Sequence, residues 1–460
     1  MSLDRRIELW LQQIETASKY THHARQGPCP KRRRLNPPTP EASQSGKSMA
    51  SSGRSLSPTK RTQAEHDDDF ETPRPLRRVR TPRSESGTSL SSTQSRSQAS
   101  SGYSSPSKQL RALQLHTRGV IPRELSVFRN KPAPLKNLLD KIDLVSSGIG
   151  ILPTSQRALF DHLDGEIYSD FEWTKQPILS NILFSDHRND LGHTPPPETI
   201  QWILHEAAYC NSRGCSEADW NAEVHHRVLA AALRPLYGPR RDQFFDFRLS
   251  TTASIIAEYH VTSASKKVDF CMYIDPKHDE AADVSEIIEA LKNVLPLGMF
   301  NHANLNPLSD NPIAVSIETK KTGEGWENAK LQMEVWMAAH WQFLRKLLEL
   351  RQRAANELSL MKQEAGDLTP NSDKPWQLPE FIPGIIIQGH DWHLIITTPE
   401  GEKTIFWQKK NFGDTSSSKG IYKIIYNLQL LRQWAQEEYS KWLRELLLEW
   451  PRHDEKLVVV

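Results

Sequence analysis

The chain has 460 residues, of which 37% are hydrophobic and 25% charged, and its formal net charge is +2. Its four cysteines are too few for the disulfide framework of a secreted protein. The first residues carry no apolar signal core, and no apolar run approaches the ~18 residues that a bilayer span requires. We therefore expect neither a secreted nor a membrane-spanning protein.

The N-terminal quarter differs in composition from the rest. Residues 1–110 are rich in Ser, Arg and Pro and hold 19 Lys+Arg against 10 Asp+Glu, which leaves 39 against 46 for the remainder. Such a segment cannot bury enough apolar surface to form a core. We expect a disordered basic arm over 1–115 and a folded domain over 116–460, with its core at about 197–450.

A compact basic cluster lies inside this arm, formed by Lys31, Arg32, Arg33 and Arg34. An exposed cluster of this kind is the physical form of a nuclear import signal. We therefore expect a nuclear protein that an import receptor recognises through these four residues. A solvated charge run is the alternative interpretation.

Two helices open the core. The first is predicted over residues 197–209. The second is predicted over 216–234, where Ser216 is a plausible N-cap and Asp219, three residues on, completes a capping box. Its apolar stripe is formed by Trp220, Val224 and Val228.

Strand-like and helical runs then alternate. Strands are predicted over 252–261, 267–274 and 312–320, with a helix over 284–295 between the second and third. A long helix over 325–354 follows, then a hairpin over 384–398, a strand over 403–408 and a closing helix over 418–449. This order predicts an α/β domain with one mixed sheet flanked by helices.

Several charged residues fall at the ends of these elements. Glu318 and Lys320 are two positions apart on a strand, so they project from one face. Asp269 lies on the preceding strand. A lone Glu-x-Lys pattern is typical of a solvated strand end. A carboxylate pair beside an ammonium group, however, is what phosphodiester cleavage with a hard divalent cation requires.

Glu223 lies on the helix over 216–234, next to its apolar stripe, and Gln332 lies on the helix that follows the Glu-Thr-Lys run. The order of helix Glu, Val268-Asp269 strand, Glu318-Thr319-Lys320 strand and Gln332-x3-Trp336 helix resembles the PD-(D/E)XK nuclease superfamily. The chain also resembles its fungal PD-(D/E)XK nuclease-like domain family, over roughly residues 150–450. The resemblance implies the restriction-endonuclease-like fold.

The resemblance also implies roles for these residues. Asp269 and Glu318 would be ligands of Mg²⁺ or Mn²⁺, and Glu223 would contact the metal directly or through water. Lys320 would orient or activate the attacking water, and Gln332 would position Lys320 or the phosphate. Asp269 and Glu318 are 49 positions apart, longer than the family's usual spacing. We therefore expect segment 275–311 to be an insertion at the edge of the site.

The sequence thus supports two functional hypotheses. In the first, the protein is a metal-dependent nuclease that hydrolyses phosphodiester bonds of nucleic acid, with DNA as the expected substrate. In the second, it is a catalytically inactive module of the same fold that binds nucleic acid or protein as a regulatory scaffold.

Overall fold

The structure is a computed structural model that describes residues 105–176, 181–234, 243–263, 265–279, 281, 283–365, 375–453 and 456–459. The predicted arm up to residue 104, including Lys31, Arg32, Arg33 and Arg34, lies outside the described residues. The arm's predicted boundary at 115 is too late, because Pro106–Leu115 form helix α2. Leu110 and Leu113 of α2 are buried, which explains why this segment folds.

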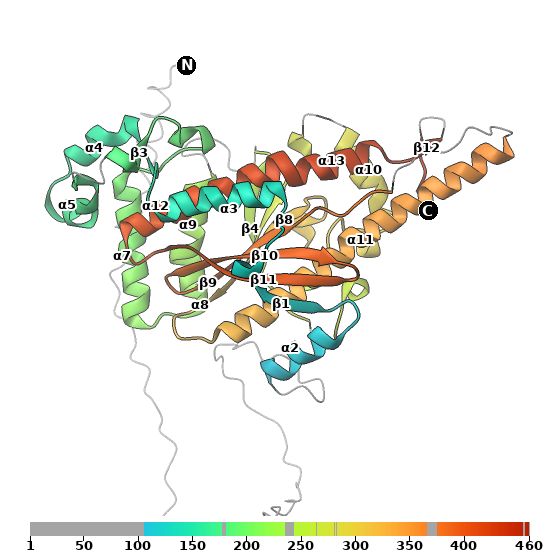
Figure 1. Cartoon of the computed structure of the whole chain (residues 1–460), viewed down its shortest axis with the longest axis horizontal. Helices are drawn as coiled ribbons and strands as arrows, with labels where there is room; N and C mark the ends of the chain where they lie inside the picture. The colour runs from blue at the N-terminus through green and yellow to red at the C-terminus, as the bar shows by residue number, and fades with distance from the viewer. Residues whose placement is uncertain are drawn as a thin grey trace, which may run out of the picture. The chain divides into compact units, whose positions relative to one another are not determined.

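A seven-stranded mixed sheet forms the centre of the described unit, as predicted (Figure 1). Its strand order is β1-β11-β10-β9-β8-β6-β4. The bounds are β1 Val120–Glu124, β4 Phe245–Leu249, β6 Phe270–Ile274, β8 Ile313–Lys320, β9 Ile382–Gln388, β10 Asp391–Glu400 and β11 Lys403–Asp414.

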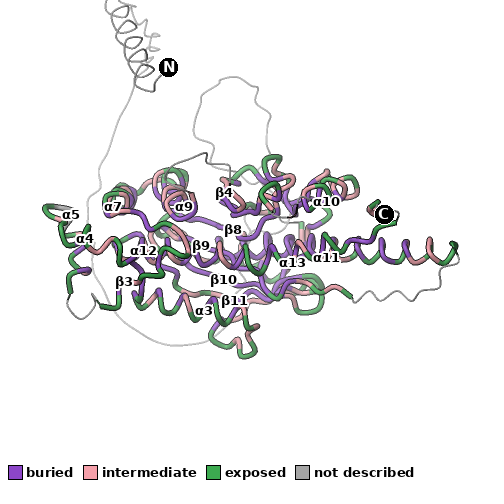
Figure 2. Tube along the Cα trace, turned by 90° about the horizontal axis from the view of Figure 1, so that it is seen from above, coloured by how far each residue is buried: buried purple, intermediate pink, exposed green. Residues whose placement is uncertain are grey.

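Helices cover both faces of this sheet. Phe270 and Met272 of β6 belong to one apolar cluster, which is completed by α3 (Ala133–Ser146), α7 (Pro197–Arg213), α9 (His226–Leu233) and α12 (Ser418–Trp434). Cys271 and Tyr273 point to the opposite face and join α2, α10 (Asp283–Lys292), α11 (Trp326–Glu364) and α13 (Ser440–Leu448). Figure 2 shows the strands buried between helices whose outer residues are exposed.

Smaller elements connect these layers. They are η1 Leu125–Val127, β2 Leu152–Pro153, η2 Thr154–Gln156, α4 Arg157–Asp161, α5 Gly165–Phe171, η3 Glu172–Lys175, β3 Phe184–Ser185, η4 Arg188–Leu191, α8 Glu217–Asp219, η5 Trp220–His225, β5 Ser254–Ile255, η6 Ala257–Tyr259, η7 Pro276–His278, η8 Pro296–Gly298, β7 Ala303–Asn304, η9 Asn306–Leu308, η10 Ala435–Tyr439, β12 Arg452–His453 and β13 Lys456–Leu457.

Strand directions decide where the functional side chains meet. The chain leaves β8, crosses the sheet as α11 and returns as β9, which pairs with β8 in parallel. β6 runs antiparallel to β8, so the start of β6 lies beside the end of β8. Asp269 and Lys320 are therefore brought to the same end of the sheet.

Segment 275–311 connects the end of β6 to the start of β8. The prediction that it lies at the edge of the site is wrong, because these strand ends are at the opposite end of the sheet from Asp269 and Lys320. The segment instead packs its own helix α10 against α13.

The predicted strand over 252–261 is also wrong over most of its length. Only Ser254–Ile255 are extended, as β5, and Ala257–Tyr259 form a helical turn. Within the described residues, no helix is both long enough and apolar enough to cross a membrane.

Candidate active site

The ends of β6 and β8 bring three of the predicted residues together. Glu318, Asp269 and Lys320 are almost fully buried, with exposed fractions of 0%, 7% and 6%. The Lys320 Nζ atom lies 2.6 Å from Glu318 Oε1. Asp269 Oδ2 accepts hydrogen bonds from the Thr319 backbone N–H at 2.8 Å and from Thr319 Oγ1 at 2.9 Å. The two carboxylates and the ammonium group therefore form one buried cluster.

The helical carboxylate in this cluster is Glu217, which the sequence analysis did not select. Its Oε2 atom lies 3.1 Å from Lys320 Nζ. The predicted helical residue, Glu223, is instead paired with Arg227, and its side chain is 46% exposed. Arg227 in turn stacks on Trp202 of α7. Glu223 thus faces α7 and not the end of β8, while Glu217 lies in the first turn of its helix, where the helix dipole favours a carboxylate.

The predicted start of this helix is confirmed. Ser216 caps it, and Asp219 completes the capping box by accepting a hydrogen bond from the Ser216 backbone N–H. This cap fixes where the first turn begins, and so places Glu217 beside Lys320.

The helix then widens into the π-helical turn η5, which places Asn221 beside the cluster. The Asn221 side chain is buried and hydrogen-bonds to Asp269. Its Oδ1 atom lies 3.0 Å from Nδ1 of His225, whose Nε2 atom lies 3.3 Å from the carbonyl oxygen of Gly389. π-Helical turns often occur at functional sites because they redirect side chains. Here the turn holds Asn221 against Asp269.

Burial and charge shift the acidity of the cluster. Burial raises the pKa of Glu318 well above its usual range, the nearby charge of Asp269 raises it further, and Lys320 opposes both. Burial also raises the pKa of Asp269, although the hydrogen bonds from Thr319 act in the other direction. Burial likewise raises the pKa of Glu217.

Burial alone would lower the pKa of Lys320, but the charges of Glu318 and Glu217 outweigh it and raise that pKa. Three carboxyl groups therefore share one ammonium group, and the site is short of positive charge.

A second lysine faces the same cluster. Burial lowers the pKa of Lys266, and the charges of Glu318 and Lys320 act on this group in opposite directions. Lys266 carries no sequence signal of this role, because it precedes β6 in an irregular segment without periodicity.

Gln332 is placed less centrally than predicted. Its Nε2 atom donates to the carbonyl oxygen of Lys267 at 3.2 Å, so it connects α11 to the segment leading into Asp269. One turn on, Trp336 is fully buried, and its Nε1–H donates to Ser316 Oγ of β8 at 2.8 Å. These two bonds fix α11 against the strands that carry the cluster.

The donor chemistry suits a hard divalent cation. Glu318 Oε2 is buried and has no hydrogen-bond partner, so it is an acceptor without a cation or donor. Carboxylate oxygens are the ligands that Mg²⁺ prefers. In the described part of the chain, however, no three His, Cys, Asp or Glu side chains converge as an ion site, since Lys320 Nζ lies between Glu318 and Glu217. Asp269 and Glu318 are the two carboxylates of the cluster nearest the unpartnered Glu318 Oε2 atom, and they would have to hold the ion together.

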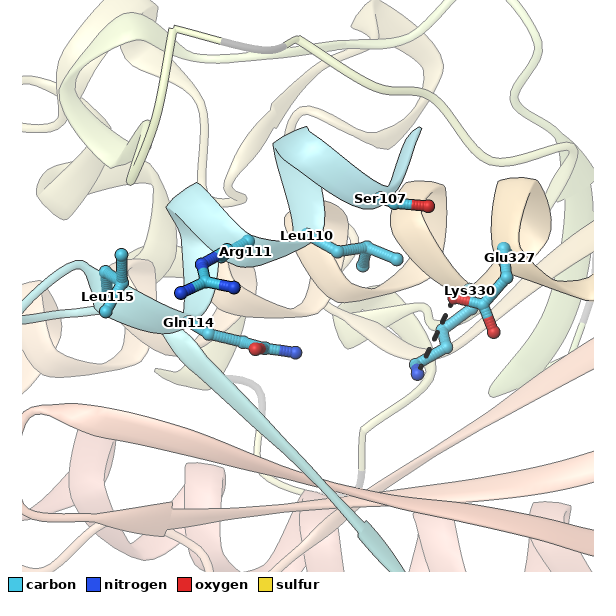
Figure 3. Close-up of a pocket in the computed structure, with 7 residues that line it drawn as sticks. All are labelled: Ser107, Leu110, Arg111, Gln114, Leu115, Glu327 and Lys330. Carbon is cyan, nitrogen blue, oxygen red and sulfur yellow. Dashed lines mark ion pairs between the residues drawn. The ribbon is translucent and has the colours of Figure 1, made fainter. Parts of the chain in front are cut away.

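A hollow of about 480 Å³ lies elsewhere, between α2 and the first turns of α11 (Figure 3). Its charged side chains include Lys330, whose Nζ atom lies 3.9 Å from Glu327 Oε2. None of the predicted site residues lines it. The buried cluster at the sheet end is therefore the candidate site.

Comparison with known proteins agrees with this geometry. A family model described as the PD-(D/E)XK nuclease superfamily matches residues 167–440, which is more than half of the chain. The chain belongs to the PD-(D/E)XK nuclease superfamily. The match spans Glu217, Asp269, Glu318 and Lys320. No curated protein and no solved structure gives a significant match.

Proposed function

We propose that this protein is a metal-dependent nuclease that hydrolyses phosphodiester bonds of nucleic acid, and that DNA is its substrate. The observation that carries the proposal is the buried group of Asp269, Glu318 and Lys320, in which Glu318 Oε2 has no partner. Membership of a nuclease superfamily supports it. A buried, unpaired carboxylate oxygen is costly unless a cation or a donor satisfies it.

Each residue of the cluster would have a different role in cleavage. Asp269 and Glu318 would hold Mg²⁺ or Mn²⁺, which would polarise the phosphate and stabilise the leaving oxygen. Thr319 and Asn221 fix the orientation of Asp269 through their hydrogen bonds. The Lys320 ammonium group donates to Glu217, to Glu318 and to the Thr319 carbonyl oxygen, so one of these three bonds would have to open before it could orient the attacking water.

Two further residues adjust the charge around this centre. Lys266 lies near enough to Glu318 and Lys320 for their charges to act on it, and its own positive charge would offset charge that develops on the phosphate. Glu217, which lies 3.1 Å from Lys320 Nζ, would compete with Glu318 for the ammonium group and so control where it points.

The second hypothesis, an inactive module of the same fold, has one observation in its favour. Lys320 Nζ already bridges Glu318 and Glu217, at 2.6 and 3.1 Å, and a structural ion pair needs no metal. In that case the cluster would only stabilise the sheet end, and the protein would bind nucleic acid or protein without cleaving it.

The proposal includes a nuclear location. It rests on the basic cluster of Lys31, Arg32, Arg33 and Arg34 as the segment that an import receptor would bind. Replacing all four by Gln in a fluorescent fusion should move the protein out of the nucleus. An unchanged distribution would remove this part of the proposal.

The cleavage experiment compares labelled single- and double-stranded DNA and RNA as substrates. The purified protein is incubated with each in Mg²⁺, in Mn²⁺ and in EDTA, beside the Lys320→Ala variant. We expect products on DNA that require the metal and are absent with the variant. Folded protein that yields no product on any substrate would contradict the nuclease and favour the inactive module.

A further inference from the structure

A hollow of about 460 Å³ lies on the β1 side of the sheet, between the segment after β1, helix α3 and strand β11. Five cations line it, namely Arg129, Lys131, Lys136, Lys409 and Lys410, against the two carboxylates of Asp140 and Asp143. We call these lining residues the basic hollow. Its positive charge is unexpected, because the chain beyond residue 110 carries more acidic than basic residues.

Some of this charge is already neutralised within the hollow. Lys136 Nζ lies 2.6 Å from Asp140 Oδ2, and Lys410 Nζ lies 2.6 Å from Asp143 Oδ1. Among the described residues, no carboxylate pairs with the remaining three cations. Lys131 donates to the carbonyl oxygen of Phe128, Lys409 lies over the ring of Trp326, and Arg129 is exposed. The hollow therefore keeps a net positive charge for a polyanion.

Trp326 contacts one lysine of the basic hollow, Lys409. It is the first residue of α11, six positions after Lys320, and is half-buried. Its ring packs edge-on against His393 of β10, with centroids 5.4 Å apart, and the Lys409 ammonium lies 4.6 Å from its centroid. A cation held over an indole face is attracted by the ring quadrupole. Trp326 thus fixes the position of the Lys409 ammonium group.

The pairing register gives the separation of the two sites. Lys320 of β8 pairs with Gln388 of β9, which pairs with Asp391 of β10, which pairs with Asp414 of β11. Lys410 lies four residues before Asp414 on β11. With strands ~4.8 Å apart and ~3.3 Å of rise per residue, the hollow is roughly 20 Å from Lys320. Several nucleotides of one strand cover such a distance.

We propose that the basic hollow, with Lys409 held by Trp326, binds the phosphate backbone of the same nucleic-acid strand that the cluster cleaves, several nucleotides from the cleaved bond. This inference rests on the proposed function for the identity of the strand. The side chains that carry it are Arg129, Lys131 and Lys409. Phosphate contacts of this kind are independent of base sequence and weaken with salt.

Binding is measured by fluorescence anisotropy in EDTA with a labelled single-stranded DNA of about 20 nucleotides, longer than most single-strand sites. All proteins carry Glu318→Gln, so that no strand is cut and one negative charge is removed from the cluster. The test variant adds Arg129→Gln and Lys131→Gln. The matched control adds Lys346→Gln and Arg353→Gln, which remove the same charge from α11 at least ~30 Å along the helix from Trp326.

Each phosphate contact on a single strand contributes ~0.7 to the salt slope, which is about fivefold in Kd at 0.1 M salt. The test variant should therefore bind about 25-fold more weakly, with a slope reduced by about 1.4, while the control is unchanged. An unchanged Kd and slope, or no binding of any strand at low salt, would overturn the proposal. So would a poly-glutamate peptide that binds as tightly as DNA with the same salt slope.

Trp326 is tested separately as a positioning residue. Trp326→Ala should weaken binding as much as Lys409→Gln, and the double variant should be no weaker than either single variant. Trp326→Phe keeps a ring face and should retain most of the affinity. Additive losses would show that Trp326 does not act through Lys409.

Cleavage by proteins with native Glu318 separates this inference from the proposed function. If no protein cleaves but Arg129→Gln/Lys131→Gln still loses affinity, the nuclease fails and the basic hollow stands. If cleavage is normal and affinity is unaffected, the nuclease stands and the basic hollow fails. Where both hold, the double variant raises KM and leaves kcat unchanged.

Discussion

Replacing Lys320 by Met tests whether three carboxyl groups depend on one ammonium group. Methionine keeps most of the buried stem and removes only the charge. At 2.6 Å from Glu318, that charge contributes about 6 kcal/mol of attraction at an effective dielectric constant of 20, before the cost of taking both groups out of water. Breaking a buried pair in this way costs ~3–5 kcal/mol. We expect that loss in the free energy of unfolding at pH 7 without divalent metal.

The loss should depend on pH and on metal in a defined direction. The folded pKa of Glu318 is raised, and losing Lys320 raises it further, so the folded state holds that proton more tightly than the unfolded state. The deficit is therefore largest at high pH, and it disappears as the pH falls through the raised folded pKa of Glu318, below which that carboxyl group is neutral in the wild-type protein as well. Mn²⁺ should restore stability above that pH, because it supplies the missing positive charge.

Urea denaturation at pH 4, 5, 7 and 8, with and without Mn²⁺, measures all three effects. Lys346→Met is the matched control, since its ion pair with Glu349 is partly exposed and should contribute less than ~1 kcal/mol. A Lys320→Met deficit below ~1 kcal/mol, or one that does not change with pH, would refute the shared-ammonium account.

Three further predictions follow from other buried charges. Glu217→Gln should lower the initial cleavage rate at least tenfold, whereas Glu223→Gln should leave it within about twofold in the same assay. Burial raises the pKa of Glu334 to about 8. The free energy of unfolding of the wild-type protein should therefore fall by ~1.4 kcal/mol per pH unit between pH ~5 and 8. Urea titrations of Glu334→Gln should lack this slope. Burial lowers the pKa of His340 to about 3, so the wild-type protein should lose stability as the pH falls below ~6.5. His340→Phe should lose less stability than the wild-type protein when the two are unfolded in urea at pH 4.

The strand residues of the site could be predicted because their pattern is local. Alternation along β6 and β8 shows which side chains share a face, and Glu318 and Lys320 project together for that reason. Asp269 could be added because β6 and β8 are joined in an order that places their ends side by side. These relations depend only on periodicity and chain order.

The helical residue could not be predicted in the same way. The apolar stripe of the helix identifies its buried face, but not which end of the helix meets the sheet end. The π-helical turn at Trp220–His225 also changes the angular spacing, so extrapolation along a regular helix misplaces Glu223. The sequence does mark Glu217 as a first-turn residue of this helix, since it directly follows the capping residue Ser216.

The remaining errors have similar causes. The strand β4 was missed although Phe245 and Phe247 alternate with Asp246 along it. Segment 275–311 was misplaced because its position depends on the direction of β6 and not on any local pattern. The basic hollow joins residues 125–143 to residues 409–410, which only the tertiary structure brings together.

If the cluster is a divalent-metal centre, the protein should bind Mn²⁺ in solution. Calorimetry would compare the wild-type protein with Asp269→Asn/Glu318→Gln, which keeps the shape of both side chains and removes their charge. We predict saturable binding to the wild-type protein and none to the variant. Equal binding to both proteins, or no binding to a folded wild-type protein, would contradict the account.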